Sequence, residues 1–244
     1  MTDGTQGNPR ARLISFSGMD GAGKSTQIQI LCDRLRQSGF RVSRLAFWDD
    51  VAMLTQVREF SGHTLFKGEK GVGSPEKPVN RRDKNVRSWY MTVMRSMLYF
   101  LDALSLCFVV MKQRRKGADV IIFDRYVHDE LANLALSNGF SRTYARLLLT
   151  ITPRPDIAYL LDADPVHARA RKPEYPVDFL EQNRAAYLAL SKVGGAMTVI
   201  PPLPIADAAH RILGELWKKL SPGDLHGFSI SAQSAPSAQG QVDA

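Results

Sequence analysis

The stretch Gly18-Met19-Asp20-Gly21-Ala22-Gly23-Lys24-Ser25 has the spacing G-x-x-x-x-G-K-S, which is typical of a loop that binds phosphate groups. A short apolar run at 13–17 precedes it, and a run at 26–35 with helical apolar periodicity follows it. Glycines let backbone N–H groups turn around phosphate oxygens, because a Cβ would block that approach. The stretch therefore predicts a strand, a phosphate-binding loop and a helix whose N-terminus faces the phosphates.

The side chains in this stretch suit the same task. Lys24 can reach the β- and γ-phosphates of a nucleotide, and the Ser25 hydroxyl can bind Mg²⁺. The residues that we expect to contact the bound nucleotide are Gly18, Asp20, Gly21, Ala22, Gly23, Lys24, Ser25 and Thr26.

Length and charge favour one large α/β domain with an excess of positive charge. The chain has 244 residues, no visible internal repeat and a formal charge of +8. Two basic clusters stand out, Arg81, Arg82, Lys84 and Arg87 in one, and Arg169, Arg171 and Lys172 in the other. Neither has interleaved aromatic residues or a nucleic-acid-binding motif, so we expect no nucleic-acid partner.

The cysteines and the apolar segments favour a cytoplasmic protein without a membrane segment. Cys32 and Cys107 lie in apolar helical patterns without metal-binding spacing, which predicts buried free thiols. Residues 1–10 are polar and lack the apolar core of a signal peptide. The apolar stretch 97–111 is short for a membrane span and contains Asp102, so we expect a buried helix there.

Strand-like and helix-like segments alternate along the chain. Further strands are expected at 41–47, 119–123, 156–161 and 198–200. Helices are expected at about 86–116, within 128–150, and at 166–171, 177–192 and 205–220. Residues 1–10 and 221–244 are expected to be disordered and 51–85 to form an irregular surface segment, which leaves one domain at 11–220.

Such alternation predicts a parallel sheet, and ligands of these sheets bind beyond the carboxyl ends of the strands. The loop at 18–25, Asp49, Asp50, Asp124 and Asp162 all fall there. Asp124-Arg125-Tyr126 directly follows an apolar strand, so Asp124 can face Mg²⁺ held by Ser25, and Arg125 can hold a second phosphate group. The structural alternative for Asp124 and Arg125 is a salt bridge.

Four segments resemble the thymidylate kinases and related nucleoside monophosphate kinases. They are the loop F-S-G-M-D-G-A-G-K-S-T at 16–26, F-D-R-Y at 123–126, P-D-I-A-Y-L-L-D-A-D-P at 155–165 and N-R-A-A-Y-L at 183–188. Their order is that of the family, and the resemblance extends discontinuously from 12 to 220.

The resemblance implies a P-loop NTPase fold with a five-stranded parallel sheet, helices on both faces and a short basic lid. It implies ATP-dependent phosphoryl transfer with Mg²⁺ to a nucleoside monophosphate, with dTMP as the expected acceptor, and it leaves room for a homodimer. Lys24, Arg125, Arg169 and Arg171 would act in catalysis, Lys172 would bind nucleotide, and Ser25 and Asp124 would hold the metal. The alternative for the lid cluster is a solvated helix end.

The acceptor region departs from the family. Phe47-Trp48-Asp49-Asp50 stands where the family has an R-E-P-G-type segment, and Leu101-Asp102-Ala103 stands where it usually offers an arginine, with Arg95 about two turns earlier. Residues 62–87 do not resemble the family, although Arg81, Arg82 and Arg87 could supply the missing phosphate contacts.

These departures leave two other functions open. One is a deoxynucleoside kinase in which Asp49 or Asp50 deprotonates a sugar hydroxyl. The other is a nucleotide-hydrolysing switch or ATPase. The sequence disfavours the second, because it has no guanine-specific N-K-x-D, and Arg125 stands where a water-activating second acidic residue would follow Asp124.

Overall fold

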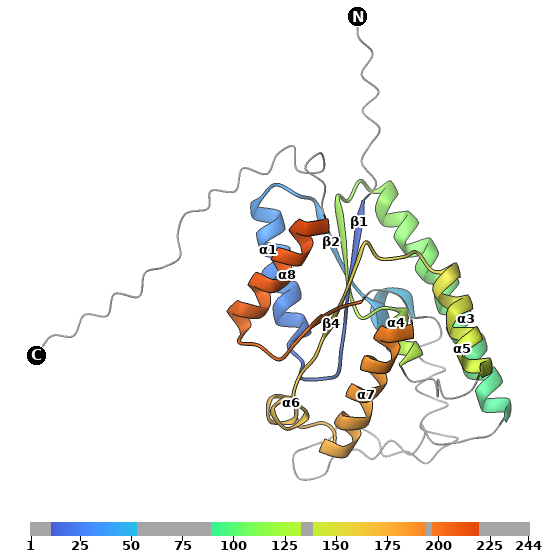
Figure 1. Ribbon diagram of the computed structural model, residues 1–244. Helices are drawn as coiled ribbons and strands as arrows, with labels where there is room; N and C mark the ends of the chain where they lie inside the picture. The colour runs from blue at the N-terminus through green and yellow to red at the C-terminus, as the bar shows by residue number, and fades with distance from the viewer. Residues whose placement is uncertain (1–10, 53–88, 133–138, 194–196, 220–244) are drawn as a thin grey trace, which may run out of the picture.

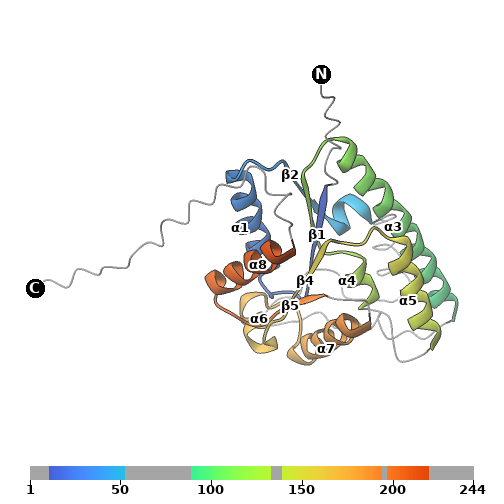
Figure 2. The same cartoon turned by 45° about the horizontal axis from the view of Figure 1, so that its top comes forward.

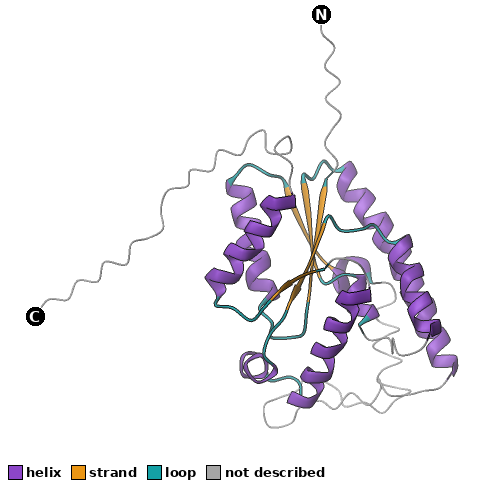
Figure 3. Cartoon of the chain, in the orientation of Figure 1, coloured by secondary structure: helices purple, strands orange, loops and turns teal. Residues whose placement is uncertain are grey.

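A computed structural model describes residues 11–52, 89–132, 139–193 and 197–219. The predictions of disorder at 1–10 and 221–244 therefore lie outside the described residues, as does nearly all of the irregular surface segment. Within the described part, a central sheet is covered by helices on both faces, as Figures 1 and 3 show.

The sheet has five parallel strands in the order β2-β3-β1-β4-β5. Their bounds are β1 (Arg12–Ser17), β2 (Val42–Ala46), β3 (Val120–Asp124), β4 (Ile157–Leu161) and β5 (Thr198–Ile200). The pairing of Phe16 with Asp124 and of Ser17 with Leu160 brings three carboxyl ends together where the loop at 18–25 begins. The predicted fold class is thus confirmed.

Two helices, α1 (Lys24–Gln37) and α8 (Ile205–Lys219), cover one face of the sheet. Their apolar sides meet the strands, with Ile28 and Leu35 of α1 and Ile212 of α8 in one buried cluster. This packing fixes the first turn of α1 at the end of β1, directly after the loop.

The other face carries a second buried cluster. The turned view of Figure 2 shows the helices that cover this face. The helices are α3 (Trp89–Arg115), α4 (Val127–Leu131), α5 (Gly139–Ile151) and α7 (Val177–Val193). The short helix α6 (Pro165–Arg171) follows β4 at the carboxyl end of the sheet. Asp164 caps it by accepting hydrogen bonds from the N–H groups of Val166 and His167, both at 3.0 Å.

The prediction that 97–111 is a largely buried helix is wrong for one face. Leu106 and Val110 are buried, but a continuous stripe of apolar side chains is exposed, with Met97 at 64% and Phe108 at 62%. We call the exposed residues Val93, Met97, Phe100, Leu104, Phe108 and Met111 the α3 stripe. By length and composition Ser96–Arg115 could also cross a membrane. The helix is therefore not too short for a membrane span, contrary to the prediction.

The second strand ends earlier than predicted. Phe47–Val51 forms a short π-helix, η1, instead of extending β2. Asp50 explains the turn, because its carboxylate accepts a hydrogen bond from the Ala46 N–H at 2.7 Å.

Candidate active site

Two glycines of the phosphate loop, Gly18 and Gly21, are needed for packing as well as for ligand approach. A Cβ at Gly18 would lie 2.4 Å from the carbonyl oxygen of Leu161, and one at Gly21 would lie 2.4 Å from that of Ala168. Both glycines also have positive φ. The loop is thus held against the end of β4 and against α6, so its shape depends on the segment that the sequence identified as a lid.

Lys24 is buried in the loop, with 7% of its surface exposed. Its Nζ donates hydrogen bonds to the carbonyl oxygens of Gly18 at 2.7 Å and Met19 at 3.0 Å. Burial, aided by the positive charge of Arg125, lowers the pKa of Lys24 to about 8. This pKa is raised from a distance by the carboxylates of Asp129, Asp20 and Asp124. No ion pair joins Lys24 to a carboxylate of the described residues, so a nucleotide phosphate would supply a closer anion.

Ser25 and Asp124 are neighbours, as predicted from the sequence. The Ser25 Oγ donates to the Asp124 Oδ2 at 3.4 Å, and Arg44 lies 3.9 Å from the same oxygen. One hydroxyl and one carboxylate at the edge of a phosphate loop fit Mg²⁺, which binds through few protein oxygens and completes its shell with phosphates and water. No cluster of three or more His, Cys, Asp or Glu side chains suited to a metal occurs among the described residues.

Arg125 reaches back to the phosphate loop. Its guanidinium pairs with Asp20 and lies 3.6 Å from Asp129. Among the described residues it is the one non-glycine residue with a positive φ, at 67°. Burial alone would lower the pKa of Arg125, but Asp129 and Asp20 raise it. Burial alone would likewise raise the pKa of Asp20, but Arg125, Lys24 and Lys172 lower it. The two side chains therefore face each other fully charged.

Asp129, which the sequence analysis did not single out, anchors this arrangement. Its carboxylate is buried and accepts hydrogen bonds from Ser17 Oγ at 2.7 Å, Tyr187 OH at 2.6 Å and the Tyr126 N–H at 3.0 Å. It joins β1, α4 and α7 beneath Arg125. Tyr187, within the family-like run at 183–188, was the one sequence signal for this site. The sequence did not indicate that its partner is Asp129.

The three lid cations lie in different places. Lys172 Nζ is 3.9 Å from Asp20 Oδ1 and 3.3 Å from Glu174 Oε1, so it faces the phosphate loop. Arg171 lines a pocket beside the loop, and its Nε donates to the carbonyl oxygen of His167 at 3.3 Å. Arg169 is not among the described residues that line this pocket. The structure therefore brings two of the three predicted cations to the loop.

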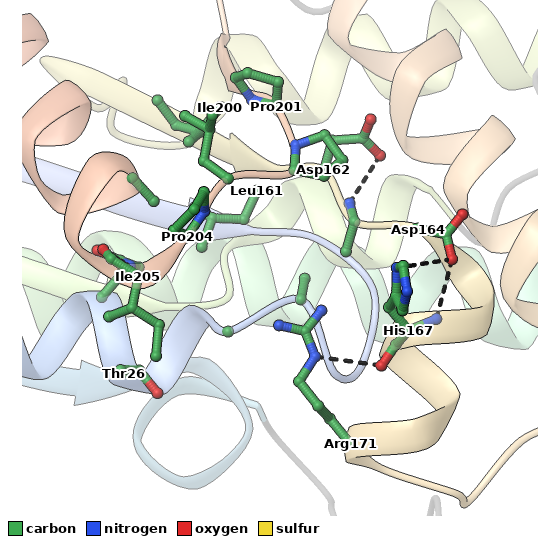
Figure 4. A pocket seen from close by; sticks show the side chains of 17 residues that line it. Thr26, Leu161, Asp162, Asp164, His167, Arg171, Ile200, Pro201, Pro204 and Ile205 are labelled. Carbon is green, nitrogen blue, oxygen red and sulfur yellow. Dashed lines mark hydrogen bonds and ion pairs between the residues drawn. The ribbon is translucent and has the colours of Figure 1, made fainter.

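A pocket of about 360 Å³ adjoins the phosphate loop. Figure 4 shows Thr26 and Ile205 on one side of it and Asp162, His167 and Arg171 on the other. The segment Ile200 to Ile205, with three prolines, supplies an apolar wall, and Gln27 Nε2 ties α1 to that segment by donating to the Ile205 carbonyl oxygen at 2.9 Å. This wall was not predicted from the sequence, although P-P-L-P after the last strand was its signal.

Arg184 holds the opposite wall. It forms a two-pronged ion pair with Asp162, with Nε and Nη2 donating at 2.6 and 2.7 Å. Asp162 thus has a structural partner at the edge of the pocket.

The acidic pair after β2 lies at the surface. Asp49 and Asp50 are both exposed, and Asp50 Oδ2 accepts a hydrogen bond from the Ala46 N–H. Arg81, Arg82, Lys84 and Arg87 lie outside the described residues, and the side chain of Arg95 is not described either.

Comparisons with known proteins point in one direction. No protein-family model matches the chain. A thymidylate kinase of Solidesulfovibrio magneticus is 24% identical over 228 residues, which cover 84% of this chain and 99% of that protein. A thymidylate kinase of Chlorobium luteolum is 29% identical over 66% of each chain. A thymidylate kinase of Danio rerio is 26% identical over 68% of this chain and 67% of its own.

The fold has a counterpart among solved structures. The crystal structure of thymidylate kinase from Ehrlichia chaffeensis matches with a TM-score of 0.56, covering 85% of this chain and 100% of that chain at 17% identity. This match supports the P-loop fold described above.

Proposed function

We propose that this chain, a thymidylate kinase-like P-loop protein, transfers the γ-phosphoryl group of ATP to dTMP. The observation that carries the proposal is the placement of buried Lys24, the Ser25–Asp124 pair and Arg125 around one phosphate loop. The curated thymidylate kinase relatives support the acceptor class, and neither the deoxynucleoside kinase nor the hydrolase alternative is favoured.

The donor nucleotide would lie along the loop with its base in the adjoining pocket. Apolar walls from Ile200 to Ile205 suit a planar base, and the loop N–H groups suit its phosphates. Lys24 would exchange its two carbonyl partners for phosphate oxygens. Because charge develops on the transferring group, a buried ammonium at that point stabilises the transition state.

Arg125 would neutralise the acceptor phosphate. Its pairing with Asp20 and Asp129 fixes the guanidinium beside the donor loop, so a second anion can bind there with little loss of side-chain freedom. A phosphate acceptor is already ionised at neutral pH and needs no general base, so this reaction requires no catalytic role of Asp49 or Asp50.

Ser25 and Asp124 are the residues that would hold Mg²⁺, which when bound neutralises charge on the phosphates. Arg169, Arg171 and Lys172 would approach the phosphates as a lid. Lys172, directly after α6, is already beside Asp20, so its side chain would exchange that carboxylate for a phosphate.

The test is ADP release from Mg-ATP across a panel of nucleoside monophosphates and free nucleosides. We expect strong stimulation by dTMP, and Lys24→Ala should lower kcat by about 10²-fold or more, since it removes charge stabilisation. Stimulation by a free nucleoside instead would indicate the deoxynucleoside kinase. High ATP turnover without stimulation by any acceptor would indicate a hydrolase.

We also infer that two chains pair through the α3 stripe and that the enzyme works in the cytoplasm. The stripe residues recur at spacings of three and four, which allows a helix to pack against its own copy about a two-fold axis. Both cysteines are free, which agrees with a reducing compartment. Cys32 is buried as predicted, whereas Cys107 is only half-buried.

A further inference from the structure

A second and larger hollow lies towards the opposite end of the strands. It has a volume of about 610 Å³ and is bordered by the end of α5, the connection 152–156 and the start of β4. We call it the distal pocket. The connection precedes β4, whereas α6 follows it, so the two lie at opposite ends of the sheet, as Figure 1 shows. It shares no lining residue with the pocket beside the phosphate loop.

One buried polar side chain lining the distal pocket lacks a hydrogen-bond partner. His128 is 4% exposed, and its Nδ1 has no partner among the described residues. Its ring lies against Tyr126, with centroids 5.7 Å apart, while the Tyr126 OH is engaged with the Pro153 carbonyl oxygen at 2.5 Å. Burial lowers the pKa of His128 to about 4, so the imidazole is neutral at pH 7. Buried polar groups are nearly always hydrogen bonded, so this one points to a missing partner.

The rim of the distal pocket is positively charged. Arg146, Arg154 and Lys219 are exposed, and none of them forms an ion pair within the described ranges. The one acidic residue lining it, Asp156, already accepts a hydrogen bond from the Leu13 N–H at 2.7 Å and lies 3.5 Å from Arg12. The rim therefore presents net positive charge to a ligand.

The walls between rim and floor are partly apolar. Leu149, Pro153, Pro155 and Met197 contribute carbon surface, and the Thr150 and Thr152 hydroxyls are used up in hydrogen bonds to α5 carbonyl groups. The volume lies within the range of pockets that hold nucleotide-sized molecules. A ligand that fits has a flat, largely apolar body with a polar edge, together with several negative charges.

We propose that the distal pocket binds a nucleoside triphosphate at a site separate from the active site. The base enters between the apolar walls and meets His128, and the phosphates lie among Arg146, Arg154 and Lys219. This site does not depend on which acceptor the kinase uses, since none of its residues belongs to the phosphate loop or the lid.

Equilibrium dialysis with radiolabelled ATP and with dTTP, without an acceptor, tests the proposal. For at least one nucleotide, we expect a class of sites that Arg146→Ala/Arg154→Ala weakens at least tenfold and that Lys24→Ala leaves intact. Lys218→Ala is the matched control, because Lys218 pairs with Glu215 at 2.8 Å and does not line the pocket. It should retain every class of sites.

The double variant replaces exposed side chains, so its thermal unfolding should match that of the wild type and its basal kcat should be unchanged. Binding of both nucleotides that is identical in the wild type and the double variant would overturn the proposal. Equal weakening by Lys218→Ala would do the same, since it would indicate attraction by general surface charge.

Discussion

The protonation of Lys24 depends on whether a nucleotide is bound. In the free protein its ammonium is buried against two carbonyl oxygens, and burial lowers its pKa from 10.5 to about 8. A bound polyphosphate favours the charged form and raises that pKa again. Nucleotide binding and protonation of Lys24 are therefore coupled.

This coupling predicts proton uptake when ATP binds. At pH 8.5 the free enzyme carries Lys24 mostly neutral, whereas the complex carries it charged, so binding should take up well over half a proton. Calorimetry at pH 8.5 in buffers with different ionisation enthalpies measures this uptake. Wild type at pH 6.5 and Lys24→Met at pH 8.5 are the controls, and both should show almost none. Equal uptake by Lys24→Met would assign the proton to another group.

The burial of Lys24 also predicts that removing its charge stabilises the fold and abolishes activity. Because the folded pKa lies below the unfolded value, the charged lysine destabilises the fold below pH 8, and this penalty is relieved as pH rises from about 8 towards 10.5. Lys24→Met should therefore raise the free energy of unfolding at pH 7 by roughly 1–3 kcal/mol while abolishing transfer. Urea unfolding measures the change. A difference that does not shrink between pH 7 and pH 10 would contradict this origin.

At the scale of elements, α6 and the phosphate loop form one packed unit through Gly21. A methyl group at this position would meet the Ala168 carbonyl oxygen at 2.4 Å. We predict that Gly21→Ala displaces α6 and raises the KM for ATP at least tenfold. Gly39→Ala is the matched control, because Gly39 also has a positive φ but has nothing within 4 Å of a new Cβ. It should lose only about 1 kcal/mol of stability through backbone strain and keep its KM.

Asp129 joins three elements beneath Arg125. We predict that it positions the Arg125 guanidinium for the acceptor phosphate. Asp129→Asn keeps the size of the side chain but removes the charge opposite Arg125, so the guanidinium loses one of its two anchors. We expect the KM for the acceptor to rise about tenfold, with the KM for ATP nearly unchanged, and the stability to fall by about 1–3 kcal/mol. Steady-state kinetics with each substrate varied in turn separates the two. A parallel rise in both KM values would mean that the loop itself has moved.

The elements differ in how far they follow from sequence. The buried strands and the loop at 18–25 were predictable, because continuous apolar runs and glycine spacing are local signals. The end of β2 at Ala46 depends on the Asp50 side chain turning back, and the role of Asp129 depends on Ser17 and Tyr187, which are distant in the chain. Apolar residues occur all around α3, so the sequence did not indicate which side of the helix meets the sheet. A buried helix was therefore predicted where one face is exposed.

At the scale of the whole molecule, the α3 stripe gathers on one helix six of the large apolar side chains that are exposed among the described residues. Large exposed apolar patches usually mark interaction surfaces. We expect the wild-type protein to be a dimer by light scattering and Phe108→Asp to be a monomer that remains folded, since 62% of Phe108 is exposed. Gln182→Asp on α7, which adds the same charge at another exposed position, should remain a dimer. A dimeric Phe108→Asp would place the interface elsewhere, and recruitment of wild type to lipid vesicles would indicate a membrane instead.

The order of the strands also governs how the protein is made. Of the five described strands, the central strand β1 is synthesised before the others, yet its partners β3 and β4 begin at residues 120 and 157. Pairing over such separations is slow, and an unpaired apolar strand invites aggregation meanwhile. Nascent chains that stop before residue 157 must therefore hold β1 with one edge open. The phosphate loop is therefore made well before its frame, which is complete only once β4 and then α6 have been synthesised.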